Sequence, residues 1–320
     1  MAKFGLLRFM IDACMIVRDG VAHVANIQPK LKPIMEIGAR LHHLHLLSPQ
    51  PEAVARFYAR AYDMRADASG SAWICTAPNR RLVIAEGPVN RLAYFAFAFA
   101  NEAALDAQRQ RASSHASIGA LIGPNVSPLF DARAFSVIDP HGNTVVFGVN
   151  DSSHDAIAHN VAATPPAPSP IRLQHFALRS TQPSDLLAFY RDALGFVVSD
   201  RVEDDTGRVR ACFLRTDTEH HALAIFDASV AQHDHLSFEA PNWTALRDWA
   251  DRMGALKEPI VWGVGRHGPG NDVFFMVRDP DGNLAEISAE IEVCAPERPE
   301  GIWPHEQRTL NLWGMALMRA

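Results

Sequence analysis

The 320-residue sequence is poor in cysteine and has no block of basic residues. Its four cysteines (Cys14, Cys75, Cys212 and Cys294) are far apart and form no Cys-x-x-Cys pair. This spacing argues against a zinc ribbon or a disulfide scaffold and favours a reducing compartment. Thirty Lys and Arg against 36 Asp and Glu give a net charge of −6, so we expect no nucleic-acid partner and no membrane partner.

Long apolar runs are also lacking, since none reaches the roughly 18 residues that a membrane span needs. The apolar N-terminal stretch is interrupted by Arg8 and Asp12 and has no small-residue cleavage site, so it is a poor signal peptide. These absences predict a cytoplasmic protein. Hydrophobic residues make up 48% and charged residues 21% of the chain, which predicts a globular core of about two domains.

An internal repeat divides the chain into two similar parts. HHLHLLSPQPEAVARFYARAYDM, which starts at His42, matches QHFALRSTQPSDLLAFYRDALGF, which starts at Gln174, and DPHGN at 139–143 matches DPDGN at 279–283. We therefore predict two similar domains that are joined by a proline-rich linker. The predicted segments are an N-terminal extension over 1–36, a first domain over 37–150, a linker over 151–170, a second domain over 171–293 and a lid-like tail over 294–320.

Hydrophobic periodicity in the second domain predicts the order β-α-β-β-β twice. The first module is predicted to have a helix from an N-cap at Ser184 through Leu194, stopped by Gly195, and the second a helix over 242–253, stopped by Gly254. The predicted strands cover 172–180, 197–203, 208–216, 221–227, 233–240, 259–263, 272–279 and 284–292. The first domain follows the same plan more loosely, so we expect an α+β fold of four βαβββ modules paired into two similar domains.

Three residues on these strands have the chemistry of metal ligands. His175 and His235 lie at the centre of the first strand of each module, and Glu286 lies on the last strand. If the curved sheets of the two modules face each other, all three side chains line one cavity. Two imidazoles and one carboxylate form the facial triad of non-haem iron(II) oxygenases, which leaves open positions for a chelating substrate and dioxygen.

The second domain resembles the vicinal oxygen chelate superfamily, which includes glyoxalases, bleomycin resistance proteins and dioxygenases, and most closely its type I extradiol ring-cleavage dioxygenases. The matching stretches are QHFALRS around His175, EHHALAIF around His221, HDHLSFEA around His235, GRHG at 265–268 and RDPDGNLAEI at 278–287. The tail IWPHEQRTLNLWG at 302–314 is similar to the lid-forming tail of homoprotocatechuate-type members.

The resemblance implies a role for each residue of the predicted site. His175, His235 and Glu286 would be the ligands of Fe(II), with Mn(II) as the other candidate. His221 would be the acid/base and His267 a hydrogen-bond donor to a substrate oxygen. The implied partners are an aromatic diol and O2, in a homo-oligomer.

Two positions depart from the family pattern. Met276 stands where the family usually has a Tyr, and methionine cannot donate a hydrogen bond to a substrate hydroxyl. Trp262 stands where relatives acting on carboxylated catechols have an Arg. Both changes favour a neutral or apolar-substituted diol. In the first domain His43 aligns with His175, but Tyr94 and Val146 replace the other two ligands, so we expect this domain to be a scaffold.

Adjacent histidines and a glycine-rich motif each allow a second interpretation. Neighbours on a strand point to opposite faces, so we expect His221 to face the cavity and His220 to face outward. GVGRHG at 263–268 fits the dinucleotide pattern G-x-G-x-x-G, but the sequence that follows predicts a strand rather than the required helix, so we reject a dinucleotide site.

The sequence therefore predicts an Fe(II)-dependent extradiol-type dioxygenase, with two alternatives. A glyoxalase-like isomerase of the same superfamily would need a fourth protein ligand near Leu223–Ile225, where only apolar residues stand. A non-catalytic small-molecule binding protein would need a cavity but no metal triad.

Overall fold

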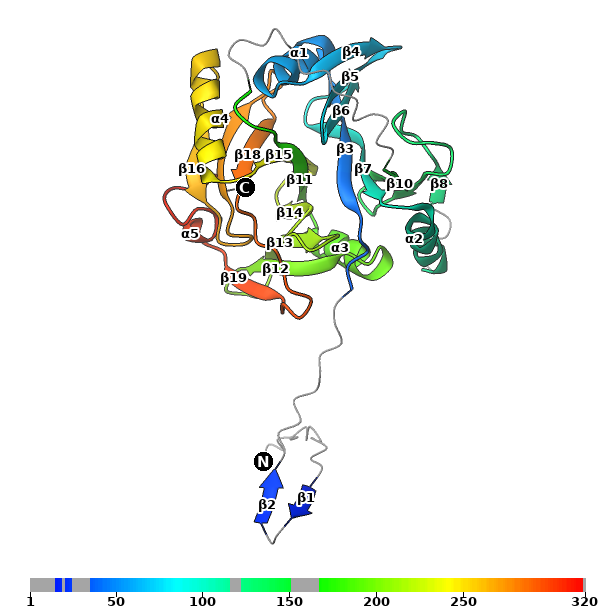
Figure 1. Cartoon of the computed structure of the whole chain (residues 1–320), viewed down its shortest axis with the longest axis vertical. Coiled ribbons are helices and arrows are strands. Elements are labelled where there is room, and N and C mark those ends of the chain that lie inside the picture. The colour runs from blue at the N-terminus through cyan, green and yellow to red at the C-terminus, as the bar shows by residue number, and fades with distance from the viewer. Residues whose placement is uncertain (1–14, 19–20, 25–34, 116–121, 151–166, 319–320) are drawn as a thin grey trace. The chain divides into compact units, whose positions relative to one another are not determined.

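Figure 1 shows a computed structural model of the chain, which describes residues 15–18, 21–24, 35–115, 122–150 and 167–318. The chain divides into two units, residues 1–34 and residues 35–320. The first unit contains an antiparallel pair of strands, β1 (Met15–Arg18) and β2 (Val21–Val24). Cys14, the apolar stretch before it and most of the predicted linker lie outside the described residues. None of the described helices has the length and apolar character needed to cross a membrane.

The first repeat forms one eight-stranded sheet from two βαβββ modules, in the order β4-β5-β6-β3-β7-β10-β9-β8. One module consists of β3 (Arg40–Ser48), α1 (Pro51–Ala61), β4 (Arg65–Ser69), β5 (Ala72–Ala77) and β6 (Arg80–Glu86). The other consists of β7 (Arg91–Phe99), α2 (Glu102–Ser114), β8 (Ile122–Pro124), β9 (Phe135–Ile138) and β10 (Thr144–Val149).

The second repeat has the same plan and adds a strand from the tail, which gives the order β16-β17-β18-β15-β11-β14-β13-β12-β19. Its first module is β11 (Arg172–Ser180), α3 (Pro183–Ala188), a π-helical turn η2 (Phe189–Ala193), β12 (Val197–Glu203), β13 (Val209–Arg215) and β14 (Leu223–Asp227). Its second module is β15 (Gln232–Ala240), α4 (Trp243–Leu256), β16 (Trp262–Arg266), β17 (Val273–Arg278) and β18 (Leu284–Ala289). The tail contributes β19 (Gly301–Pro304) and α5 (Gln307–Leu310). The predicted α+β architecture is confirmed.

Two predicted helix ends are wrong. The N-cap of α3 is Gln182 rather than Ser184, because Pro183 occupies the first helical turn, where its fixed φ fits and its missing N–H costs nothing. Helix α4 continues through Gly254 to Leu256 and ends at Lys257, which has a φ of 61°. A glycine inside a helix costs only about 1 kcal/mol, and the buried Trp249 and Met253 anchor α4 against the core. Gly195, with a φ of 77°, follows the first helix as predicted.

The strands of the second sheet alternate between a shared core and an inner face. Phe176, Leu236 and Ile287 point into the core, whereas their neighbours His175, His235 and Glu286 belong to the other face. The two modules join edge to edge through the antiparallel pair β11–β15, and the single curved sheet wraps around its own inner face (Figure 1). The predicted face-to-face arrangement of two sheets is therefore wrong, although the predicted convergence of strands is correct.

The two repeats share one apolar core. Phe95 of the first sheet packs on Phe176 of the second at 4.4 Å between ring centroids. The hydroxyl of Tyr190 donates to Asp139 of the first repeat at 2.8 Å, and the hydroxyl of Tyr58 donates to Asp279 of the second at 3.5 Å. Each repeat thus holds the DPxGN turn of the other, while the predicted domain boundaries stay a prediction.

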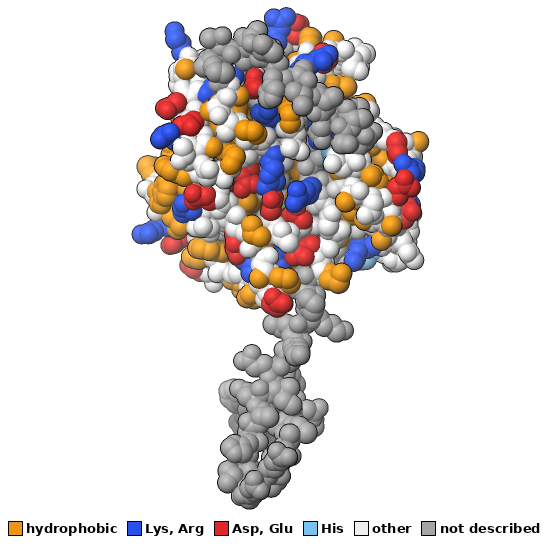
Figure 2. All heavy atoms as spheres, viewed as in Figure 1, with side chains coloured by type: hydrophobic (Ala, Val, Ile, Leu, Met, Phe, Trp, Pro, Cys, Tyr) orange, Lys and Arg blue, Asp and Glu red, His pale blue; other side chains and the backbone are white. Residues whose placement is uncertain are grey.

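Thiols and surface charge agree with the expectations from composition. Cys75, Cys212 and Cys294 are free and buried, so these described cysteines form no disulfide. In Figure 2, positive and negative side chains are mixed over the described part of the face in view.

Candidate metal centre

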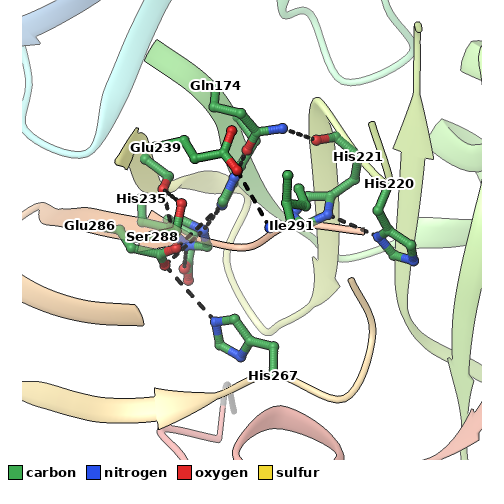
Figure 3. Close-up of polar contacts among 12 residues, drawn as sticks. Gln174, His220, His221, His235, Glu239, His267, Glu286, Ser288 and Ile291 are labelled. Carbon is green, nitrogen blue, oxygen red and sulfur yellow. Dashed lines mark hydrogen bonds and ion pairs between the residues drawn. The ribbon is translucent and has the colours of Figure 1, made fainter. Parts of the chain in front are cut away.

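The centre lies in one row of side chains that crosses five neighbouring strands. Cross-strand pairing places Trp262 beside Met276, Met276 beside Glu286, Glu286 beside Ser237 and Ser237 beside His175. His235 lies two residues before Ser237 on the same face of β15. The period of two along each strand and the register across the sheet therefore bring the predicted ligands together. Figure 3 shows His235, Glu286 and His267 converging from separate strands and loops.

Three buried side chains have the separations expected of ligands to one ion. His175 Nε2 is 3.3 Å from His235 Nε2, Glu286 Oε1 is 3.8 Å from the first nitrogen, and Glu286 Oε2 is 3.9 Å from the second. Since imidazole nitrogens and carboxylate oxygens bind metals at about 2.0–2.2 Å, two ligands of one ion lie at most about 4.4 Å apart. All three separations satisfy this limit.

The hydrogen bonds behind the two histidines leave a lone pair on each Nε2 that faces the centre. The Gln174 amide donates to the His221 carbonyl at 2.8 Å, so its oxygen accepts from His175 Nδ1 at 2.5 Å. Asp234 accepts from His235 Nδ1 at 2.6 Å. Both Nε2 atoms are then unprotonated in the neutral rings, as metal-binding histidines require.

The charge state of the ligands also suits a cation. Burial lowers the pKa of His175 to about 3, although Glu286 opposes the shift, so the ring is neutral. Burial alone would raise the pKa of Glu286, but the neighbouring imidazoles of His267, His175 and His235 lower it to about 2. Glu286 Oε2 is buried with no hydrogen-bond partner. A carboxylate facing two nitrogen lone pairs is the environment that a divalent metal satisfies, so the residues fit the predicted metal.

His267 is held at the edge of the centre by the tail. Its Nδ1 donates to the Leu310 carbonyl at 2.6 Å, its ring stacks on Phe274 at 3.8 Å, and its Nε2 is 4.0 Å from Glu286. Burial opposes protonation, but the carboxylates of Asp272 and Glu286 raise the pKa of His267 above its usual value. His267, Asp272 and Glu286 form a second group of side chains whose ligand atoms lie close together. The raised pKa favours a proton on His267 Nε2, which makes this ring a donor toward the cavity rather than a metal ligand.

His221 lines the same cavity, with its ring 4.4 Å from that of His175. His220 is not exposed as predicted, because the pair lies in the turn before β14 rather than on the strand, and both side chains are buried. The His220 Nδ1 is 3.0 Å from the His221 Nδ1, and its Nε2 is 2.9 Å from Asp200 (Figure 3 shows the two rings). Sequence reasoning missed this contact with Asp200, and it also missed Gln174 and Asp234, although each of these two directly precedes a predicted ligand.

The cavity beside the ligands is small and mostly apolar. Besides the histidines it is lined by Phe213, Ala224, Phe226, Trp262, Pro269, Met276 and Leu310. Its free volume is about 20 Å³. This is far below the roughly 300–1,000 Å³ of typical small-molecule pockets. Leu310 belongs to the tail. The Met315 carbonyl, also in the tail, accepts a hydrogen bond from the Trp262 indole at 3.0 Å. The tail therefore closes the cavity.

The corresponding place in the first sheet is filled by side chains. His43 pairs with Ala96 as His175 pairs with Ser237, and Tyr94 and Val146 occupy the register positions of His235 and Glu286. Tyr94 and Val146 pack with Phe130, and His43 is 2.7 Å from the Ser127 hydroxyl. These replacements agree with the predicted scaffold role.

Comparison with known proteins points to one superfamily. The model of the Glyoxalase/Bleomycin resistance protein/Dioxygenase superfamily matches residues 172–287. Metapyrocatechase 2 of Cupriavidus necator is 33% identical over 147 residues, which are 45% of this chain and 45% of that protein. Biphenyl-2,3-diol 1,2-dioxygenase 3 of Rhodococcus globerulus is 29% identical over 157 residues, 45% of this chain and 75% of that protein. The match thus spans less than half the length of the first of these relatives.

A solved structure extends the likeness to nearly the whole fold. Homoprotocatechuate 2,3-dioxygenase from Arthrobacter globiformis superposes with a TM-score of 0.73 at 20% identity and covers 91% of each chain. The paired βαβββ modules and the sequence match over the repeat that contains His175, His235 and Glu286 agree with each other. Residues 172–287 of the chain therefore match the Glyoxalase/Bleomycin resistance protein/Dioxygenase superfamily, and the solved structure shares the fold.

Proposed function

We propose that this protein is an Fe(II)-dependent extradiol-type dioxygenase that opens the ring of a neutral or apolar-substituted aromatic diol with O2. The proposal rests on one observation above all: two unprotonated imidazole nitrogens and a buried carboxylate whose Oε2 has no hydrogen-bond partner converge at the edge of an apolar cavity. The relatives by sequence, which include a biphenyl-2,3-diol dioxygenase, support it.

Each part of the site has a task in such a reaction. His175, His235 and Glu286 would hold the metal, which would supply the centre that binds diol and dioxygen together and exchanges electrons with them. His221 accepts the proton of a diol hydroxyl and later returns it to the opening ring. His267 donates a hydrogen bond to an oxygen of the reactants, and the apolar walls exclude water. Both atoms of O2 enter the product as the ring carbon–carbon bond beside the diol breaks.

A glyoxalase-like isomerase is less well supported. Its fourth protein ligand would have to come from the end of β14, where Ala224 lines the cavity and Leu223 and Ile225 lie in the core. None of these three side chains can bind a metal.

The proposal is tested by loading the protein with Fe(II) or Mn(II) without oxygen and then adding O2 and single diols. Appearance of the strongly absorbing ring-opened product with catechol or biphenyl-2,3-diol would support it, and the better metal would identify the cofactor. A metal-loaded protein that opens no diol but isomerises a thiohemiacetal would overturn it. The predicted homo-oligomer and cytoplasmic location stay predictions.

Substrate preference follows from the wall of the cavity. Trp262 and Met276 offer no cation and no hydroxyl donor toward it, so a carboxylated diol such as homoprotocatechuate would bury an unpaired charge. We expect kcat/KM for biphenyl-2,3-diol to exceed that for homoprotocatechuate by at least tenfold, as steady-state assays would measure. Met276→Tyr should raise kcat/KM for catechol itself by restoring a hydroxyl, an effect of about 0.5–1.5 kcal/mol. A preference for carboxylated diols in the unaltered protein would contradict this.

The tail should limit the size of the substrate. Leu310 closes the cavity, whereas Leu312, two residues further on, is exposed. We expect Leu310→Ala to lower the KM for the larger biphenyl-2,3-diol several-fold relative to catechol, and Leu312→Ala to leave the ratio unchanged. Equal ratios in both variants would mean that the tail does not restrict the substrate.

A further inference from the structure

We infer that Asp200 and His220 set the tautomer of His221 and so determine that its unprotonated Nε2 is presented to the diol. The inference rests on the proposed function for its catalytic consequence, but its structural part concerns only the protons on two buried rings. Asp200, His220 and His221 are each at most 3% exposed, so no solvent competes for their hydrogen bonds.

The first link is the carboxylate of Asp200. Its Oδ1 accepts from Arg298 at 3.0 Å, and its Oδ2 accepts from the Trp303 indole at 2.9 Å. Guanidinium and indole are donors only, so they select the ionised carboxyl, which can only accept. Although burial opposes ionisation, these donors and His220 lower the pKa of Asp200. The His220 Nε2, 2.9 Å from Oδ2, must therefore carry a proton.

The second link is that the tautomer of His220 fixes the tautomer of His221. A neutral imidazole protonated at Nε2 has a lone pair at Nδ1. The His220 Nδ1 is 3.0 Å from the His221 Nδ1, so His221 must donate there. Its own Nε2 is then left unprotonated, as a base that takes a proton from a diol must be. The reverse tautomer would place two N–H groups or two lone pairs against each other in a site closed to water.

The third link ties this arrangement to the tail. Arg298 and Trp303 both belong to the tail, and β19 pairs with β12 so that Gly301 lies opposite Asp200. A Cβ at Gly301 would overlap the Asp200 carboxylate, so glycine is required for this close approach. The segment that covers the cavity through Leu310 thus also holds the group behind His221.

During the reaction the diol proton moves to His221 Nε2, and the resulting imidazolium keeps its Nδ1–H on His220. The negative charge of Asp200, one ring away, offsets the new positive charge. When the proton returns to the opening ring, the starting arrangement is restored. Asp200 and His220 are therefore positioning residues, which touch neither the diol nor the metal ligands.

The test compares His220→Phe, which keeps an aromatic ring but removes the acceptor, with His220→Gln, whose amide oxygen can still accept from His221 Nδ1. Hydrogen-bond partners behind metal ligands typically contribute 10–100-fold to metal affinity or activity, and we expect the partner behind an acid/base to act on the same scale. We expect His220→Phe to lower kcat for catechol 10–100-fold with KM changed less than threefold and metal content unchanged. His220→Gln should recover most of kcat, a rescue that loss of packing alone would not show.

A second measurement reads the tautomer directly in the metal-free protein, without substrate. In ¹H–¹⁵N spectra of histidine-labelled protein, His221, assigned with His221→Gln, should have its proton on Nδ1. In His220→Phe this preference should be lost. A proton on Nε2 of His221 in the unaltered protein, or an unchanged tautomer together with unchanged kcat in His220→Phe, would overturn the inference. If no diol is opened by any form of the protein, the proposed function fails, and the spectra alone decide the tautomer.

Should His220→Phe fail to fold, Gly301→Ala displaces Asp200 without altering either histidine. It should lower kcat several-fold at unchanged metal content and shift the His221 tautomer, and a variant with neither change would count against the inference.

Discussion

Alanine in place of His175, His235 or Glu286 is expected to abolish retention of the metal. Each replacement leaves two ligands. The loss of metal affinity should therefore exceed the 10–100-fold that is usual when a residue hydrogen-bonded to a ligand is replaced. The unaltered protein should hold one metal per chain. Metal analysis after loading without oxygen and desalting measures both numbers.

Matched controls separate loss of a ligand from loss of the fold. Glu286→Gln keeps the volume of this fully buried side chain and should also lose the metal. His43→Ala removes a buried histidine at the equivalent strand position of the first repeat and should retain a full complement. Two metals per chain, or full retention in His235→Ala, would refute the assignment.

His221→Ala is expected to behave differently, with the metal kept and kcat reduced by roughly 10² to 10⁴, the range for loss of a positioned acid/base. The ring of His221 contacts that of His175, but no nitrogen of His221 belongs to the triad. Single-turnover assays with a set metal content measure the effect. Loss of metal instead would show that His221 is a ligand and that the triad is incomplete as described.

The ligand strands could be predicted because the repeat and the alternation along each strand are local patterns. His175, His235 and Glu286 are each followed on their strand by an apolar residue that points into the core, and the duplicated order showed which strands correspond. The pairing of β11 with β15 was not accessible, because alternation shows which face a side chain takes but not which strand lies beside it.

The surroundings of His221 escaped prediction for a different reason. Asp200 accepts hydrogen bonds from Arg298 and Trp303, which lie about 100 positions further along the chain. Hydrophobic periodicity in the sequence does not predict such long-range contacts. The burial of His220 was missed because the rule of opposite faces holds only on a strand, and this pair precedes one. Likewise, Pro183 rather than Ser184 decides where α3 begins.

The hydrogen bonds of Tyr58 with Asp279 and of Tyr190 with Asp139 make each repeat depend on the other for the position of one turn. The turn that Tyr58 supports leads directly into β18 and Glu286, so the repeat without ligands braces the strand that carries one. We therefore expect a substitution at Tyr58 to disturb the position of Glu286 through the turn at Asp279. A chain cut between the repeats would expose both sides of this brace, and neither fragment should be soluble by itself.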